Sequence, residues 1–217
     1  MTGIRCMMMA GEMVNGNKKG DNMNVITEFQ KSPFRFGTHL DRLFSCDEAI
    51  TGVEVGVHQG IHAKKMLQAH PRLTLLGIDL WEKHVERDSS YLTSPGVMPA
   101  QFKDVEKAKE WRRISEKTVA PFGGRCELHC MSSAEFASVT IDDSLDFVYI
   151  DADHSYEGCM RDLKWWAPKV RQGGIIAGHD YQYPPVKKAV DQFFIEHEVY
   201  HNSAEPTKEG LCWMVMV

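Results

Sequence analysis

From residue 52 onwards, short apolar runs typical of buried strands alternate with stretches whose apolar residues recur at helical spacing. Strands are expected at 74–79, 126–130, 146–150 and 175–177, with a further strand leading into the glycines of 52–60. Helices are expected at 38–45 and 102–120, after Gly60, from Ala134, after Ser155, and around Val186–Phe194. This alternation predicts an α/β protein of the Rossmann-like, doubly wound type, whose mostly parallel sheet is covered by helices on both faces.

Both ends of the chain break this alternation. Residues 197–202 and 211–217 have the pattern of two strands with no helix between them, so we expect a C-terminal antiparallel hairpin. Residues 1–31 are rich in Met, Gly, Asn and Lys and have no sustained period, which favours a flexible arm over a lid or an oligomer contact. We therefore expect a single domain over 32–217, and the pattern leaves a homo-oligomer open.

The net charge indicates which partners the protein can bind, and the cysteines indicate the redox state of its compartment. The net charge is −5 and the pI about 6.1, so no basic field for nucleic acid is expected. No apolar run reaches the roughly 18 residues of a membrane span, and the N-terminus lacks the apolar core of a signal peptide. Cys126 and Cys130 would lie about 13 Å apart along one strand, too far for a disulfide. These features indicate a cytoplasmic protein with reduced thiols.

The glycines of 52–60 indicate a ligand site. Gly56 and Gly60 follow an apolar strand, Glu54 lies two residues before the first, and Asp79 ends the next strand. Glycine lets backbone approach a ligand, the first amides of the following helix point into the same space, and an acid at the second strand tip suits a ribose diol. The three-glycine spacing that holds a pyrophosphate is missing. A nucleoside cofactor without a pyrophosphate fits best, and S-adenosylmethionine is the obvious one.

Polar side chains follow the carboxyl ends of the expected strands, where ligands bind in open parallel sheets. They are Glu54, Asp79, Ser132-Ser133, the segment 151–154 and His179-Asp180. Asp151 and Asp180 follow neighbouring strands, and two converging carboxylates repel each other unless something lies between them. A hard divalent cation would neutralise them, with His179 as a nitrogen donor. The alternatives are a helix cap or a cofactor contact for Asp151, and a turn residue for Asp180.

Two longer segments, 146–157 and 165–181, resemble a particular group of enzymes. Within the class I S-adenosylmethionine-dependent methyltransferases, they resemble small O-methyltransferases that include metal-dependent sugar-modifying enzymes and, more distantly, the catechol-type enzymes. The resemblance runs from about Gly52 to Val217, and it implies the class I methyltransferase fold with its terminal hairpin.

The resemblance also implies a magnesium ion held by Asp151 and Asp180. Catechol-type enzymes have an asparagine where this chain has Tyr181, and sugar-type enzymes have an acid where it has His179. The third ligand and the identity of the metal therefore stay open.

His154, three residues after Asp151, matches the proposed general base of the sugar-type relatives. Imidazole titrates near pH 6.5, which suits uptake of the proton that an acceptor hydroxyl loses; the alternative is a histidine that caps or orients the loop. The residues expected to hold the cofactor are Glu54, Gly56, Gly60, Asp79, Leu80, Ser133 and Asp151, with Trp81 near the adenine.

The expected function is methyl transfer from S-adenosylmethionine to a hydroxyl of a small polar acceptor, such as a sugar or glycoside, with the help of a divalent metal. A binding module without turnover competes with it, but such a module has no need for the polar residues at 151–154 and 179–180. An NAD-dependent dehydrogenase is a further alternative, and the missing pyrophosphate glycines argue against it.

Overall fold

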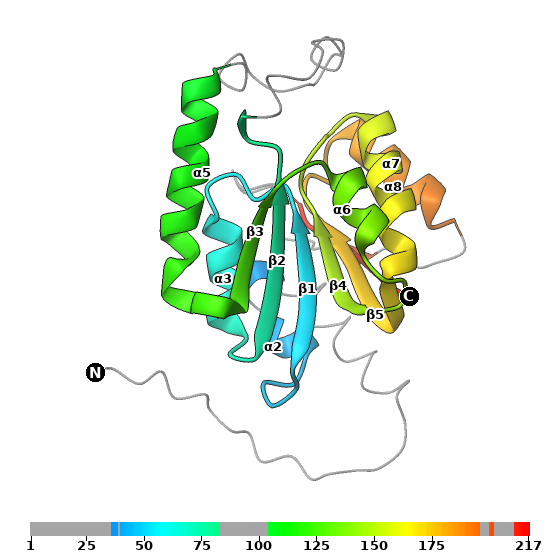
Figure 1. Cartoon of the computed structure of the whole chain (residues 1–217). Helices are drawn as coiled ribbons and strands as arrows, with labels where there is room; N and C mark the ends of the chain where they lie inside the picture. Colours follow the sequence, from blue (N-terminus) through cyan, green and yellow to red (C-terminus); the bar gives the residue numbers. More distant parts are fainter. Residues whose placement is uncertain (1–35, 39, 83–103, 196–199, 202–210) are drawn as a thin grey trace.

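A seven-stranded sheet with the order β3-β2-β1-β4-β5-β7-β6 forms the centre of the protein (Figure 1). The structure is a computed structural model, and it describes residues 36–38, 40–82, 104–195, 200–201 and 211–217. The first five strands run parallel, whereas β7 pairs antiparallel with both β5 and β6. The predicted doubly wound sheet with a terminal antiparallel pair is therefore confirmed.

The strands are β1 (Ile50–Val55), β2 (Leu73–Asp79), β3 (Cys126–Cys130), β4 (Leu145–Ile150), β5 (Val170–Gly178), β6 (Tyr200–His201) and β7 (Trp213–Met216). The α-helices are α2 (Leu40–Leu43), α3 (Ile61–Ala69), α5 (Val105–Val119), α6 (Ser133–Val139), α7 (Tyr156–Trp166) and α8 (Pro184–Phe193). The short 3₁₀ helices are η1 (Phe36–Thr38), η4 (Ala120–Arg125) and η5 (Ala167–Lys169).

Helices cover both faces of the sheet (Figure 1). On one face, η1, α2, α3 and the end of α5 pack with strand residues such as Ile50, Phe147 and Tyr149. On the other face, α6, α7 and α8 pack with Val53, Val148 and neighbouring residues. The period of two along each strand separates the two cores. Because β1 lies between β2 and β4 and runs parallel to both, its carboxyl end is flanked by the ends of β2 and β4.

Side-chain caps fix where several helices begin. Asp104 accepts hydrogen bonds from the amides of Glu106 and Lys107 at the start of α5. Ser132 caps α6 in a reciprocal capping box with Glu135. Ser155 accepts from the Gly158 amide at the start of α7, as its sequence position predicts.

Two elements differ from the sequence expectation. Strand β5 begins at Val170, before the expected strand at 175–177, because the Gly174 carbonyl accepts from the Val217 amide and joins the ladder beside β7. The helix expected at 38–45 is only one turn long, preceded by a 3₁₀ turn. The predicted arm at 1–31 and the connection between the two expected C-terminal strands, at 203–210, lie outside the described residues.

Two further findings concern cysteines and membranes. Cys126 and Cys130 are both free thiols, as predicted from their positions in one strand. Within the described residues, none of the helices combines the length and the apolar character needed to cross a bilayer.

Candidate active site

Backbone contact joins the glycine loop after β1 to the end of β4. The Gly56 amide donates to the Ile78 carbonyl (2.8 Å), and the Asp151 amide donates to the Val55 carbonyl (2.8 Å). Gly56 has φ +95°, and a Cβ at this position would lie 1.9 Å from the Asp151 carbonyl oxygen. Only glycine permits both this conformation and this approach. Gly60 (φ +74°) then starts α3, so the loop follows the strand–turn–helix course that the sequence predicts.

Asp79, at the tip of β2, holds this loop in place. Its carboxylate accepts hydrogen bonds from the His58 amide (2.8 Å) and from the Trp81 amide (2.9 Å). The Trp81 indole donates to the His58 carbonyl (2.8 Å) and is buried against Val57. A carboxylate offers about four lone-pair positions, so accepting these amides does not by itself prevent Asp79 from accepting from ribose hydroxyls as well. Trp81, the predicted neighbour of the adenine, therefore also stabilises the loop through its hydrogen bond to His58.

Two other predicted cofactor residues lie close to these loops. Leu80 is half-buried after β2, and its carbonyl accepts a hydrogen bond from the Cys130 thiol (3.4 Å). Glu54 is 1% exposed, and its Oε1 lies 2.8 Å from Nδ1 of His62. Its Oε2 is buried without a hydrogen-bond partner among the described residues. Burial raises the pKa of Glu54, so this carboxyl group would gain most from a cationic or donor group of a ligand.

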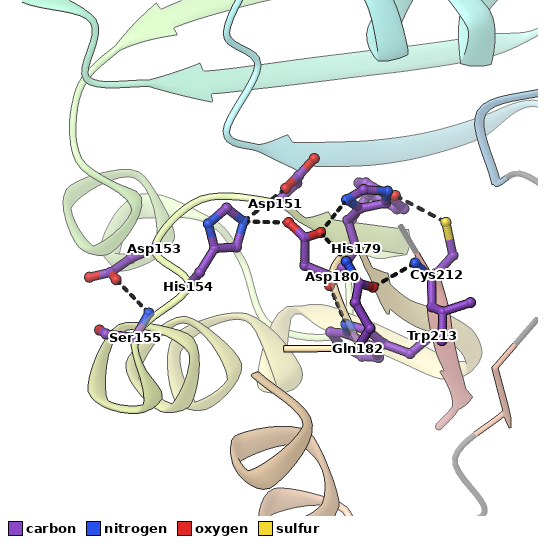
Figure 2. A network of polar contacts seen from close by, with 11 residues as sticks. Asp151, Asp153, His154, Ser155, His179, Asp180, Gln182, Cys212 and Trp213 are labelled. Atoms are coloured by element: carbon purple, nitrogen blue, oxygen red, sulfur yellow. Dashed lines mark hydrogen bonds and ion pairs between the residues drawn. The ribbon is translucent and has the colours of Figure 1, made fainter. Parts of the chain in front are cut away.

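Asp151, His154 and Asp180 form a compact polar cluster at the ends of β4 and β5. Nε2 of His154 lies 3.3 Å from Oδ1 of Asp151 and 2.8 Å from Oδ2 of Asp180 (Figure 2). One donor atom from each residue lies within 4.8 Å of the others, a spacing suited to a metal ion. The structure therefore brings together the two acids that the sequence predicts as neighbours, with the predicted base between them.

Asp180 is held in place by a dense set of neighbours. It is 9% exposed and has φ +60°, an unusual conformation for a residue with a side chain. Its Oδ1 accepts a hydrogen bond from the Gln182 amide group (2.9 Å) and lies 3.2 Å from Nδ1 of His179. Gln182 in turn accepts from the Leu211 amide (2.6 Å), which ties this turn to the segment before β7. Sequence reasoning missed Gln182, because its contacts depend on the fold of the turn.

The charges of the cluster are strongly coupled. Hydrogen bonds to Asp151 and Asp180 raise the pKa of His154 to about 10. Burial alone would raise the pKa of Asp180, but hydrogen bonds from His154 and His179 lower it below its ordinary value. In this arrangement, a protonated His154 lies between the two carboxylates that were expected to repel each other and offsets one of their two negative charges.

Two predicted site residues, His179 and Ser133, also make contacts that the sequence does not indicate. His179 lies on the far oxygen of Asp180 and is absent from the cluster that could hold a metal, whereas His154 belongs to it. The Ser133 hydroxyl donates to Asp162 (2.7 Å) and accepts from the Trp166 indole (2.8 Å). Its contacts therefore fasten α6 to α7, which the local sequence around Ser133 does not reveal.

Comparison with known proteins identifies the family. The model of a family described as a methyltransferase domain matches residues 53–181, which include the glycine loop and the whole polar cluster. The chain belongs to this methyltransferase family. No curated protein matches the methyltransferase significantly.

Solved structures confirm the class I methyltransferase fold. An O-methyltransferase from Bacillus cereus, in complex with S-adenosylhomocysteine, is 15% identical with a TM-score of 0.56, covering 92% of this chain and 88% of that one. TomG from Streptomyces achromogenes, an O-methyltransferase of tomaymycin synthesis solved with S-adenosylmethionine, is 14% identical with a TM-score of 0.58, covering 94% and 92%. A putative O-methyltransferase from Klebsiella pneumoniae is 16% identical with a TM-score of 0.57, covering 94% and 92%.

Proposed function

We propose that this methyltransferase transfers a methyl group from S-adenosylmethionine to a hydroxyl of a small polar acceptor. The observation that supports this most is the position of Asp151. Its backbone contacts the glycine loop at Val55 and Gly56, and its carboxylate lies in the cluster with His154 and Asp180. A donor bound at the loop and a hydroxyl at the cluster would therefore be neighbours, and proximity is a large part of catalysis when the donor is already activated.

The cofactor would lie across the carboxyl ends of β1, β2 and β4. We propose that Gly56 and Gly60 allow its close approach, that Asp79 accepts from the ribose hydroxyls, and that Leu80 and Trp81 pack near the adenine. Glu54, with its free Oε2, is the candidate partner for a donor group of the amino-acid part. Asp151 would line the space between cofactor and acceptor. Ser133 would act only through the placement of α6, since its hydroxyl is engaged with Asp162 and Trp166.

The cluster is the proposed site of proton uptake. An attacking hydroxyl loses its proton as its oxygen accepts the methyl group, and a nearby base speeds this step by roughly 10²–10⁴-fold. His154 can accept the proton only in its neutral form. The two carboxylates raise the pKa of His154 to about 10, so it is mostly protonated at neutral pH and must lose a proton before it can act as a base.

The donor set fits a divalent cation. Two carboxylates and one imidazole lie within 4.8 Å of one another, and oxygen-rich sets with one nitrogen suit magnesium, manganese or other divalent ions. We propose Asp151, Asp180 and Nε2 of His154 as the groups that would hold it, with His179 supporting Asp180 from the other side. While Nε2 holds the ion it cannot also take up a proton, so the base role of His154 belongs to the metal-free cluster. A bound cation would supply positive charge that lowers the pKa of an acceptor hydroxyl.

A transfer assay with labelled methyl groups tests the proposed reaction. The protein is incubated with S-adenosylmethionine carrying a radioactive methyl group and a panel of sugars, glycosides and catechols, with and without divalent ions. We expect label in a product that survives treatment with hydroxide, because a methyl ether is stable to base whereas a methyl ester is not. Label that is released by base, or that is transferred only to an amine, would contradict transfer to a hydroxyl.

A further inference from the structure

Tyr183 presents an exposed aromatic ring beside the polar cluster. It is 50% exposed and lies in the turn that follows Asp180, and its amide donates to the Asp180 carbonyl (2.8 Å). Pro184 and Pro185 follow it as the first residues of α8 and restrict the backbone of the turn. The position of this ring is therefore coupled to the position of Asp180.

The ring lies next to the group that we propose to handle the proton. The ring centroids of Tyr183 and His154 are 6.0 Å apart, with an interplanar angle of 53°. The side chains of His154 and Asp151 are 28% and 33% exposed, so the cluster is open to solvent. Tyr183 thus stands beside a polar site that a small molecule can reach.

Neighbouring tyrosines in this region have internal partners. The Tyr156 hydroxyl donates to Gln192 (2.7 Å), and the Tyr181 hydroxyl donates to Asp191 (2.5 Å). The Tyr183 hydroxyl has no hydrogen-bond partner among the described residues, and half of the side chain faces water. An aromatic face that the fold does not use, next to convergent polar groups, is typical of a small-molecule site.

We propose that Tyr183 is an acceptor-binding residue, and that the acceptor is a cyclic molecule whose flat apolar face stacks on this ring while a hydroxyl at its edge meets His154. This inference rests on the proposed function and adds the shape of the substrate to it. An aromatic phenol and the C–H face of a pyranose share this chemistry, since both pair an apolar face with hydroxyl groups at the rim. Stacking would orient the ring, and the cluster would select the hydroxyl that reacts.

The test uses the full chain saturated with S-adenosylhomocysteine and two probes, catechol and methyl α-D-glucopyranoside. Binding of each probe is measured by saturation-transfer NMR, which also reports which face of the probe lies on the protein. We expect at least one probe to bind through its ring face, and its identity distinguishes the aromatic from the carbohydrate acceptor. Tyr183→Leu should weaken the binding of that probe about tenfold. Tyr183→Phe, which keeps the ring, should bind within about twofold of wild type.

Two controls separate the inference from a loss of folding and from the proposed function. Trp165→Leu removes another exposed aromatic, 42% exposed at the end of α7, and should leave probe binding unchanged. Affinity for S-adenosylhomocysteine should be the same in all variants, which shows that they are folded. Equal probe binding by Tyr183→Leu and wild type, or binding of neither probe to the loaded protein, would overturn the inference. Failure of S-adenosylhomocysteine to bind at all would instead overturn the proposed function, and the inference with it.

Discussion

Gly56 and the Asp151 carbonyl oxygen lie so close that a Cβ on Gly56 would be 1.9 Å from that oxygen. This contact joins the predicted cofactor loop to the strand end that carries the polar cluster. A small change at Gly56 should therefore disturb both halves of the proposed site at once.

Gly56→Ala should lose S-adenosylhomocysteine binding by at least about 100-fold and destabilise the fold by roughly 1–3 kcal/mol. The physical reason is the combination of a positive φ with a backbone clash that cannot be relieved by a rotamer change. Gly124→Ala is the matched control, because a Cβ there meets nothing within 4 Å. Calorimetry and urea unfolding measure the two effects. Normal binding by Gly56→Ala would show that the loop does not approach the cofactor in this way.

The divalent site should depend on Asp180. Asp180→Asn should abolish most divalent-ion binding and most methyl transfer. S-adenosylhomocysteine affinity should change little, because the side-chain contacts of Asp180 run to His154, His179 and Gln182. Asp153→Asn is the control: it alters a carboxylate of the same loop whose Oδ1 accepts from the Ser155 amide and which is not part of the cluster. The direct measurement is a titration with Mn²⁺ in which electron paramagnetic resonance reports the bound ion. Full activity in excess EDTA would contradict the proposal that the reaction needs a divalent ion.

The two histidines beside Asp180 should behave differently. His154→Ala should weaken Mn²⁺ binding and lower the rate by roughly 10²–10⁴-fold, because His154 is a candidate ligand when the ion is bound and the candidate base when it is not. His179→Ala should keep Mn²⁺ binding nearly intact, because Nδ1 of His179 lies on the other oxygen of Asp180. Loss of binding in His179→Ala alone would restore His179 as the third ligand, as the sequence suggested.

Part of the fold and of the candidate site could be predicted from the sequence alone. The strand Leu145–Ile150, the Ser155 cap and the strand tips bearing Asp79, Asp151 and Asp180 follow from local patterns of apolar runs and caps. Local pattern suffices there because strand period and capping are decided by adjacent residues.

The arrangement inside the site depends on contacts that local pattern does not encode. His154 lies between two carboxylates because of the turn after β4 and the positive φ of Asp180. Ser133 is drawn to α7 by Asp162, a residue 29 positions away. Orientation within a turn and long-range side-chain partners are decided by tertiary packing, so spacing alone pointed to His179 as the third metal ligand and to His154 only as the base.

Asp162 should make stability depend on pH. It is 2% exposed, and burial raises its pKa from 3.8 to about 6. A raised folded-state pKa means that the folded protein binds the proton more tightly than the unfolded chain, so stability falls as pH rises from about 4 to about 6 and the loss persists above that. The loss is about 2–3 kcal/mol by the size of the shift.

Asp162→Asn should remove this dependence, since an uncharged amide can still accept from Ser133. At pH 7.5 the variant should be more stable than wild type by roughly 1–3 kcal/mol, and near pH 3.5 the two should be equal. Urea unfolding at several pH values measures the difference, with Glu157→Gln, an exposed acid of the same helix, as control. A constant difference between Asp162→Asn and wild type across this range would contradict an ionised, buried Asp162.

Calorimetric titration with S-adenosylhomocysteine and, separately, with NAD tests the central claim most directly, because both the glycine loop and Asp79 are assigned to a nucleoside cofactor without a pyrophosphate. We predict that S-adenosylhomocysteine binds with a Kd of about 10 μM or tighter and that NAD does not compete. Asp79→Ala should weaken binding by roughly 1–3 kcal/mol through the loss of charged hydrogen bonds. Tight binding of NAD without any response to S-adenosylhomocysteine would contradict the account.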